Sequence, residues 1–137
     1  RAVDLADAEQ LAAVRNESFG GDWNARTYRD EVMRKPGYRA CREIVAVAPD
    51  GRAAAFAVTW FDEVNRVGHF EPVGTSHRFR RLGLARALLL HGLGEMRRAG
   101  MRTATVQHDA SNRAAAELYA NLGFEKRYET YGFRRVE

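Results

Sequence analysis

Residues 67–108 contain, in order, the patterns of a strand, a short loop, a long helix and a second strand. Val67–Thr75 and Thr103–His108 contain the β-branched residues that strands favour. Leu84–Arg98 has leucines and alanines at helical spacing, and Gly100 follows it, as glycine commonly does at a helix end. Two strands joined by a crossover helix run parallel in one sheet, and the crossover is right-handed. This segment therefore predicts a parallel pair of strands with a helix packed across it.

Further strands are expected on both sides of this segment. Ile44–Ala48 and Ala53–Phe61 are apolar runs separated by a Pro-Asp-Gly turn. Together with Val67–Thr75 they predict an antiparallel meander. A strand end is expected at Arg1–Val3, and a last strand or hairpin over Phe124–Arg134.

Three other segments predict helices. Asp4–Glu17 has apolar residues at helical spacing, Asn24–Met33 ends before the breaker pair Pro36-Gly37, and Ser111–Leu122 is followed by Gly123. In the last of these Ser111 is the expected N-cap, because a serine hydroxyl can accept a bond from a free amide of the first turn. Together, the predicted strands and helices indicate an α/β (α+β) fold, in which a mixed central sheet has helices on both faces. The length predicts one domain over residues 1–137.

The composition, 45% hydrophobic and 29% charged residues, is that of an ordinary globular domain. No apolar run approaches the roughly 20 residues of a membrane span, so we expect no membrane partner. Cys41 is the only cysteine, which excludes an internal disulfide and fits a cytoplasmic location. Because the chain begins at Arg1 rather than Met, we expect residues upstream of it, either a short tail or a whole preceding domain.

The net charge of +4 is compatible with an anionic partner. However, the basic residues are spread along the chain among 18 acids, and only His77–Arg81 forms a cluster. Binding of RNA or DNA through Arg78–Arg81 is therefore disfavoured, since it requires basic or aromatic residues spread over one face. No metal site is expected, because none of the four histidines has metal-ligand spacing with another ligand.

The loop that opens the long helix has the features of a phosphate site. Gly83 lets the backbone approach a ligand closely, and the first amides of a helix lack acceptors at the positive end of its dipole. Such an end binds phosphate or pyrophosphate. The residues concerned are Arg80, Arg81, Leu82, Gly83, Leu84, Ala85 and Arg86. An ordinary glycine-containing loop before a helix fits the same residues, and neither the P-loop pattern nor the dinucleotide fingerprint is present.

Two further patterns indicate chemistry. Asn112 and Tyr119 lie seven residues apart, on one face of the predicted helix, with the small Ala115 between them. This arrangement fits a slot for an extended ligand. It also fits an alternative in which Asn112 is only a helix-start residue and Tyr119 only a core residue. Glu71-Pro72 lies within a strand, where Pro requires an edge or a bulge, and a bulge leaves a backbone group free. Glu71 could be a base, an amine anchor or a solvated strand residue.

In this order and spacing the motifs resemble the GCN5-related N-acetyltransferase (GNAT) family. Arg80-x-x-Gly83-x-Ala85 matches the acyl-CoA signature R-x-x-G-x-[GA] of the family, and Asn112, Tyr119 and Gly123-Phe124 match its second block. The order of elements fits over the whole chain, and residues 67–124 contain the specific part. The segment 60–75 looks like a group of bacterial GNATs often found as one half of a two-domain chain. The expected partner is therefore either a second GNAT domain or a second copy of the chain in a homodimer.

The resemblance implies an acetyl-CoA site. Backbone groups for the pantetheine arm would come from Val73, Gly74 and Thr75. Arg81–Arg86 would wrap the pyrophosphate with amides. Asn112 and Ala115 would lie toward the pantetheine or acyl end.

The implied reaction moves an acetyl group to a primary amine of a small-molecule or peptide acceptor, by direct attack in a ternary complex. The free amide of Val73 would stabilise the oxyanion. Glu71, or failing it His69, would take the amine proton, and Tyr119 would protonate the CoA sulfur. The alternative is a non-catalytic CoA-binding module of a tandem GNAT protein, against which the presence of both Asn112 and Tyr119 argues.

Overall fold

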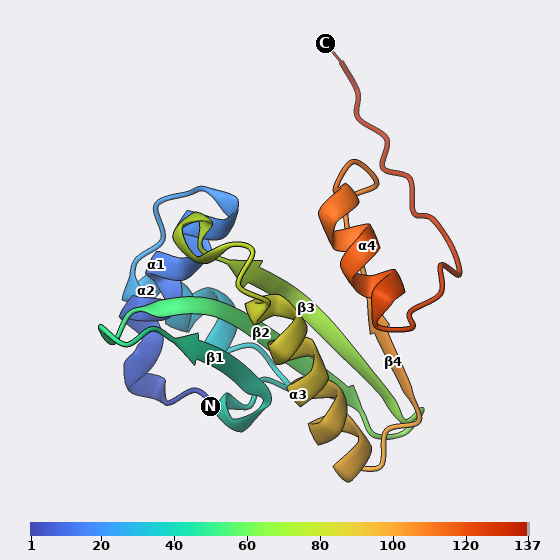
Figure 1. Ribbon diagram of the computed structural model, residues 1–137, viewed down its shortest axis with the longest axis horizontal. Coiled ribbons are helices and arrows are strands. Elements are labelled where there is room, and N and C mark those ends of the chain that lie inside the picture. Colours follow the sequence, from blue (N-terminus) through green and yellow to red (C-terminus); the bar gives the residue numbers. More distant parts are fainter. Residues whose placement is uncertain (137) are drawn as a thin grey trace. The chain divides into compact units, whose positions relative to one another are not determined.

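In the computed structural model, which describes residues 1–136, four strands form one sheet in the order β1-β2-β3-β4 (Figure 1). Their bounds are β1 Glu43–Val47, β2 Ala53–Asp62, β3 Val67–Thr75 and β4 Thr103–Val106. The first three strands pair antiparallel, whereas β3 and β4 pair parallel. The expected meander and the parallel crossover are therefore confirmed. Ala2 forms an isolated antiparallel bridge to Ile44, where a strand end was expected.

The helices lie close to their expected positions. Their bounds are α1 Ala8–Phe19, α2 Ala25–Tyr28, α3 Leu84–Arg98 and α4 Arg113–Asn121. Shorter helical turns lie at Leu5–Asp7, Arg29–Met33, Ala40–Arg42 and His77–Phe79. The first two helical segments start after Asp4 and Asn24, whose side chains accept the amides of Ala6 at 2.8 Å and Thr27 at 2.9 Å. No helix within residues 1–136 has both the length and the apolar surface needed to cross a membrane.

The chain divides into two units, Arg1–Gln107 and His108–Glu137. The first unit contains the sheet with α1, α2 and α3, and the second contains α4 and the segment that follows it. The single domain expected over residues 1–137 stays a prediction.

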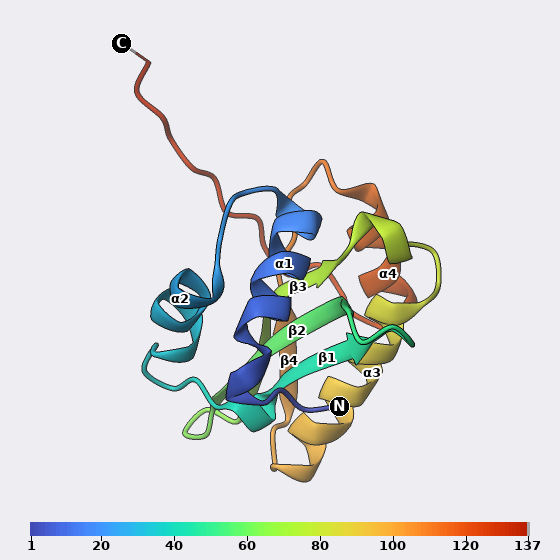
Figure 2. The ribbon, with the colours of Figure 1, turned by 90° about the vertical axis from the view of Figure 1, so that its left-hand side faces the viewer.

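In the first unit, helices cover both faces of the sheet (Figures 1 and 2). On one face, residues of α1, α2 and β2 form a buried cluster that includes Leu11, Val14, Tyr28, Phe56 and Val58. On the other face α3 packs on β3, where Gly92 lies against the ring of Phe70, which is 1% exposed. The predicted mixed sheet with helices on both faces is confirmed.

A bulge in β3 reverses the alternation of its side chains. The pairing with β2 shifts between Phe70 and Val73, so that Glu71-Pro72, joined by a cis peptide bond, stand opposite the single residue Val58. An edge or a bulge was expected here, because Pro has no amide hydrogen to give to a ladder. One extra residue moves every later side chain to the opposite face. Phe70 therefore faces α3, whereas Gly74 beyond the bulge faces α1.

The start of α4 differs from its prediction. The N-cap is Asn112, whose side-chain oxygen accepts the amide of Ala115 at 3.0 Å. Ser111, the expected cap, instead donates its amide and its hydroxyl to Asp109, at 2.8 and 2.5 Å. An aspartate side chain commonly accepts a hydrogen bond from the residue two positions further on. Asp109 accepts from Ser111 in this way, so the serine does not cap the helix. The assignment of Ser111 as the cap is therefore wrong.

The segment 124–134 has no regular secondary structure, so the expected strand or hairpin is wrong. Its large side chains lie in solvent: Tyr128 is 70% exposed, Tyr131 73% and Phe133 99%. An extended segment is stable as a strand only when its backbone groups pair with a neighbour. No strand within residues 1–136 pairs with it.

Candidate active site

A cavity of about 440 Å³ opens in the first unit beside the bulge of β3. Small-ligand pockets typically have volumes of roughly 300–1,000 Å³. The lining residues come from α1 and α2, the segments that follow them, β2 and β3: Arg15, Trp23, Tyr28, Glu31, Val32, Lys35, Trp60, His69, Glu71 and Pro72. The proposed base Glu71 and its alternative His69 therefore line one cavity.

Glu71, His69 and Thr105 form a chain of polar contacts across β3 and β4. The Nε2 atom of His69 lies 3.1 Å from Oε2 of Glu71, and its Nδ1 atom lies 2.7 Å from Oγ1 of Thr105. His69 and Glu71 share a face because they are two residues apart in one strand. Thr105 was not predicted as a site residue. The parallel register places it opposite His69, and no local sequence pattern reports that register.

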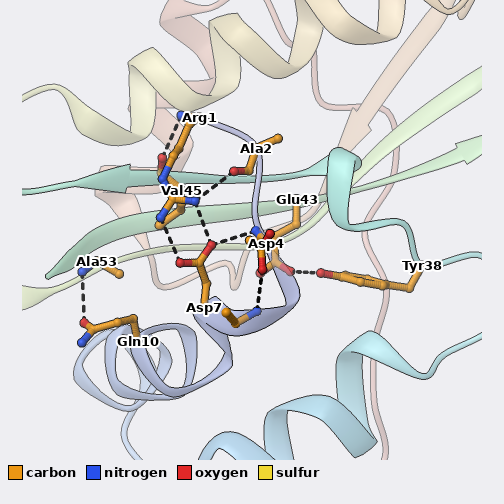
Figure 3. Close-up of polar contacts among 10 residues, drawn as sticks. Arg1, Ala2, Asp4, Asp7, Gln10, Tyr38, Glu43, Val45 and Ala53 are labelled. Atoms are coloured by element: carbon orange, nitrogen blue, oxygen red, sulfur yellow. Dashed lines mark hydrogen bonds and ion pairs between the residues drawn. The ribbon is translucent and has the colours of Figure 1, made fainter. Parts of the chain in front are cut away.

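A buried carboxylate fixes the aromatic walls of the cavity. Glu43 is 0% exposed and accepts hydrogen bonds from the hydroxyls of Tyr28 and Tyr38. The bond from Tyr38, at 2.5 Å, is drawn in Figure 3. The ring of Tyr38 meets Trp60 edge to face, with centroids 6.4 Å apart. The indole N–H of Trp60 donates to the carbonyl of Glu71 at 2.8 Å. The Glu43 carboxylate thus binds the Tyr38 hydroxyl, the Tyr38 ring packs against Trp60, and Trp60 is hydrogen-bonded to the bulge.

Burial raises the pKa of Glu43, although the two tyrosine hydroxyls favour its charged form. Burial and the adjacent carboxylate also raise the pKa of Tyr28 and of Tyr38, so both phenols keep their protons at neutral pH. Since both oxygens of Glu43 already accept tyrosine hydroxyls, we assign it to positioning the walls. Within residues 1–136, no group of three or more His, Cys, Asp or Glu side chains could hold a metal ion.

The loop before α3 has the backbone conformation of an anion site. Arg81 and Gly83 are both left-handed, with φ of 64° and 74°, and left-handed turn residues can arrange successive amides around a concavity. Gly83 is the N-cap of α3 and supplies no side-chain hydrogen bond, so the first-turn amides have no side-chain cap. Arg80, Arg81 and Arg86 are exposed. The loop thus presents free amides together with positive charge.

β3 and β4 separate beyond Phe70. Their last pair joins Phe70 to Val106, where β4 ends, two residues before the predicted end at His108. Within residues 1–136, no strand pairs with residues 71–75 on that side. A strand with one open side can bind an extended ligand through main-chain hydrogen bonds.

The register decides which backbone groups of β3 face this opening. The amide of Ser76 donates to the carbonyl of Ala54 at 2.9 Å, so these two residues form a hydrogen-bonded pair. Such pairs alternate with non-bonded pairs along an antiparallel ladder. Gly74 therefore directs its amide and carbonyl to β2, whereas Val73 and Thr75 direct theirs to the open side.

In the second unit, α4 carries the remaining predicted residues. Asn112 uses its side-chain oxygen as the cap, and Ala115 is half-buried. Tyr119 is 8% exposed and packs against His108 and Phe124, with ring centroids 5.8 and 6.0 Å apart. Burial raises the pKa of Tyr119, so the phenol is protonated at neutral pH, as a general acid must be. The roles of these residues in binding and chemistry stay predictions.

A match to a family model tests the family resemblance that the motifs indicated. The model of the acetyltransferase (GNAT) family matches residues 8–124. The chain belongs to this family. The match runs from the start of α1 to Phe124, and it includes both the loop before α3 and α4.

Two acetyltransferases are similar in sequence to this GNAT chain. It is 37% identical over 79 residues to the [ribosomal protein bS18]-alanine N-acetyltransferase of Escherichia coli (strain K12), a match covering 56% of this chain and 51% of that protein. It is 37% identical over 87 residues to the mycothiol acetyltransferase of Nocardiopsis dassonvillei, covering 58% of this chain and 26% of that protein. The chain thus spans about half the length of the first relative and about a quarter of the second.

Solved structures show the same fold. The crystal structure of the Escherichia coli ribosomal-protein-S18-alanine N-acetyltransferase has a TM-score of 0.77 at 24% identity, covering 93% of this chain and 77% of that one. The structure of AAC(6')-Iy in complex with the bisubstrate analogue CoA-S-monomethyl-acetylneamine has a TM-score of 0.77 at 21% identity, covering 99% and 96%. At these identities the likeness establishes the GNAT fold of the chain.

Proposed function

We propose that this GNAT chain is an acetyl-CoA-dependent N-acetyltransferase acting on a primary amine. The observation that carries the proposal is the open side of β3 directly before the α3 loop. An extended arm that ends in a pyrophosphate needs main-chain partners along its length and free amides at its end. The open strand and the loop supply these in that order. A structure with the same fold contains a CoA-linked analogue, which agrees with this assignment.

The open strand and the loop support an assignment of residues to acetyl-CoA, to which the family resemblance adds Asn112. Val73 and Thr75 would bind the pantetheine arm through main-chain groups, and Gly74 between them would keep the strand in register with β2. The amides and guanidinium groups of Arg81–Arg86 would bind the pyrophosphate. Asn112 would contact the pantetheine or acyl end through its side-chain amide.

The chemistry assigned to this chain is a direct attack of the amine on the thioester, with one proton taken from the nitrogen and one given to the sulfur. The neutral acceptor amine attacks the thioester carbonyl, so that an N–C bond forms and the C–S bond breaks. The amide of Val73 would stabilise the oxyanion. Glu71 would take the proton that the nitrogen loses, and Tyr119 would give one to the sulfur. One proton leaves nitrogen and one reaches sulfur, so the transfer is balanced.

The cavity beside Glu71 is the proposed acceptor site. Its aromatic residues Trp23, Tyr28 and Trp60 suit a flat or apolar body, while Glu71 suits the amine. Its volume of about 440 Å³ fits a small molecule or the end of a peptide. A screen of thiol release from acetyl-CoA with amines of both kinds tests the activity. CoA binding without thiol release for any amine would instead support the non-catalytic module.

Gly83→Val is expected to weaken acetyl-CoA binding by at least tenfold, which corresponds to about 1.4 kcal/mol. Apart from Gly83 and its two chain neighbours, no atom of residues 1–136 lies within 4 Å of the position that a Cβ would take at Gly83. The added side chain would therefore occupy space proposed for the ligand. Isothermal titration calorimetry measures the change.

Gly100→Val is the matched control for this substitution. Gly100 also has a positive φ, 85°, and open space around its Cβ position, but it follows the opposite end of α3. The control therefore carries the same backbone strain without touching the loop. Equal binding by wild type and Gly83→Val would refute the site, and equal losses in both variants would assign the effect to strain.

Glu71→Gln separates two roles for Glu71. If Glu71 is the base, kcat falls and the acidic limb of the pH–rate profile, which reports the essential base, changes. If Glu71 only anchors a cationic acceptor, KM rises with kcat nearly unchanged, since uniform binding is lost. We expect the first outcome. Glu63→Gln, at an exposed glutamate in the turn after β2, is the control.

A further inference from the structure

We propose that Arg15 binds an anionic oxygen group of the acceptor, a carboxylate or a phosphate, in the cavity that Glu71 also lines. This inference rests on the proposed acetyl transfer and narrows its acceptor to amines that carry such a group at a distance from the nitrogen. Arg15 comes from α1 and Glu71 from β3. Because the two side chains have opposite charges, a ligand with an amine and an anionic group can bind to both.

The helical repeat of α1 places Arg15 at the border of its buried side. Leu11, four residues earlier, is 0% exposed, and the preceding Val14 is 1% exposed. Residues four apart lie on the same side of a helix. Arg15 is half-buried as a result. A long basic side chain can pack its stem on apolar surface while its charged end stays accessible. The charged end of Arg15 lies beside Trp23, which lines the cavity as well.

The ring of Trp23 orients the guanidinium of Arg15. Its Cζ atom lies 3.9 Å from the ring centroid, within the range of a cation–π contact. Trp23 is itself bound to α1, because the side-chain amide of Asn16 donates to its carbonyl at 2.8 Å and its own amide donates to Asn16 Oδ1 at 3.0 Å. Stacking uses the face of a guanidinium, whereas its N–H donors lie in the plane of the group. The donors therefore remain available to an anion.

The positive charge of Arg15 forms no ion pair with a side chain of residues 1–136. The ion pairs in this part of the chain use other residues. Partial burial of a charge is unfavourable unless a partner compensates it. The planar fork of a guanidinium matches a carboxylate or a phosphate through two parallel hydrogen bonds. A ligand with such a group would supply the missing partner.

The other charged side chains of the cavity are less suited to this role. Lys35 and Glu31 are both exposed, and their charges are of opposite sign. The ammonium group of a lysine also lacks the fork and ends a flexible stem. Glu71, which lies 3.1 Å from Nε2 of His69, would repel an anionic group. The repulsion favours one orientation of the ligand, with its amine at Glu71 and its anionic group at Arg15.

Matched pairs of aromatic amines test the preference for charge. The acids are benzoates that carry an aminomethyl, aminoethyl or aminopropyl group para to the carboxylate, and each is compared with its benzamide. The two members of a pair share the ring and the amine and differ in the negative charge. O-phosphotyramine and tyramine make the same comparison for a phosphate. Both tryptophans of the chain, Trp23 and Trp60, line the cavity, so quenching of intrinsic fluorescence measures the Kd without turnover.

At least one acid is expected to bind to the wild type at least about tenfold more tightly than its neutral counterpart, the usual effect of a hydrogen bond to a charged group. Arg15→Gln should reduce this ratio to near one, and Arg15→Lys, which keeps the charge without the fork, should retain part of it. A preference among the benzoates would identify a carboxylate, and a preference for O-phosphotyramine a phosphate. Equal Kd values within every pair, no binding of any probe, or a preference that survives Arg15→Gln would overturn the proposal.

Two control variants remove other cations. Lys35→Gln changes the lysine of the cavity, and Arg29→Gln changes an exposed arginine outside its lining. Both should keep the wild-type ratio, and its loss in Lys35→Gln alone would assign the anion to Lys35 and contradict the inference. Absence of thiol release with every amine, beside a preference in binding that depends on Arg15, would refute the acetyl transfer and not the anion site. Thiol release without any preference for charge would do the reverse.

Discussion

Tyr119→Phe is expected to lower kcat by roughly 10²- to 10⁴-fold, the usual contribution of a general acid. Folding and acetyl-CoA binding should be retained, because the substitution keeps the ring that packs against His108 and Phe124. Only the hydroxyl is removed, and with it the proton that the leaving thiolate needs. Single-turnover measurements of thiol release, together with calorimetry for CoA binding, check the prediction.

Tyr128→Phe is the control for this variant, since Tyr128 lies in the same unit and is 70% exposed. It should turn over as wild type does. Near-wild-type turnover by Tyr119→Phe on a good acceptor would remove Tyr119 from the chemistry and leave it as a packing residue of α4. A loss of folding in Tyr119→Phe would contradict the separation between ring and hydroxyl on which the prediction depends.

Gly92→Ala is expected to destabilise the protein by about 1–3 kcal/mol, the usual cost of overpacking a core. A Cβ at this position would lie 2.5 and 2.8 Å from two ring atoms of Phe70, a fully buried side chain of β3. Replacing a mid-helix glycine by alanine normally stabilises by roughly 0.5–1 kcal/mol. The clash should exceed this gain, because both distances are far below van der Waals contact and the Phe70 ring is 1% exposed. Urea unfolding measures the free energy.

Gly94→Ala provides a control with the opposite expected sign. Gly94 lies two residues further along α3, and the nearest side-chain atoms to a Cβ there would be the guanidinium nitrogens of Arg98, at 3.8 Å. Its stability should therefore rise by up to about 1 kcal/mol. If both variants gained stability, the close packing of α3 on Phe70 would be contradicted.

Sequence patterns predicted the elements that depend on local signals. The bounds of β3 and α3 agree with their predictions, because their ends carry turn and glycine signals. The order of the motifs predicted the GNAT family, and the family model confirms it. An edge or a bulge at Glu71-Pro72 could also be predicted, since Pro cannot donate to a strand ladder, and the register shows the bulge. The predicted roles of Glu71 and Tyr119 in chemistry are left to experiment.

Other features depended on contacts between residues far apart in the chain. Parallel register places Thr105 beside His69, 36 residues away. The fold likewise buries Glu43 against Tyr28, which lines the cavity. The segment 124–134 has strand-forming residues but no partner within residues 1–136, so its pattern alone was insufficient. Local propensity sets the conformation that a segment favours, whereas register and burial depend on which distant segments pack against it.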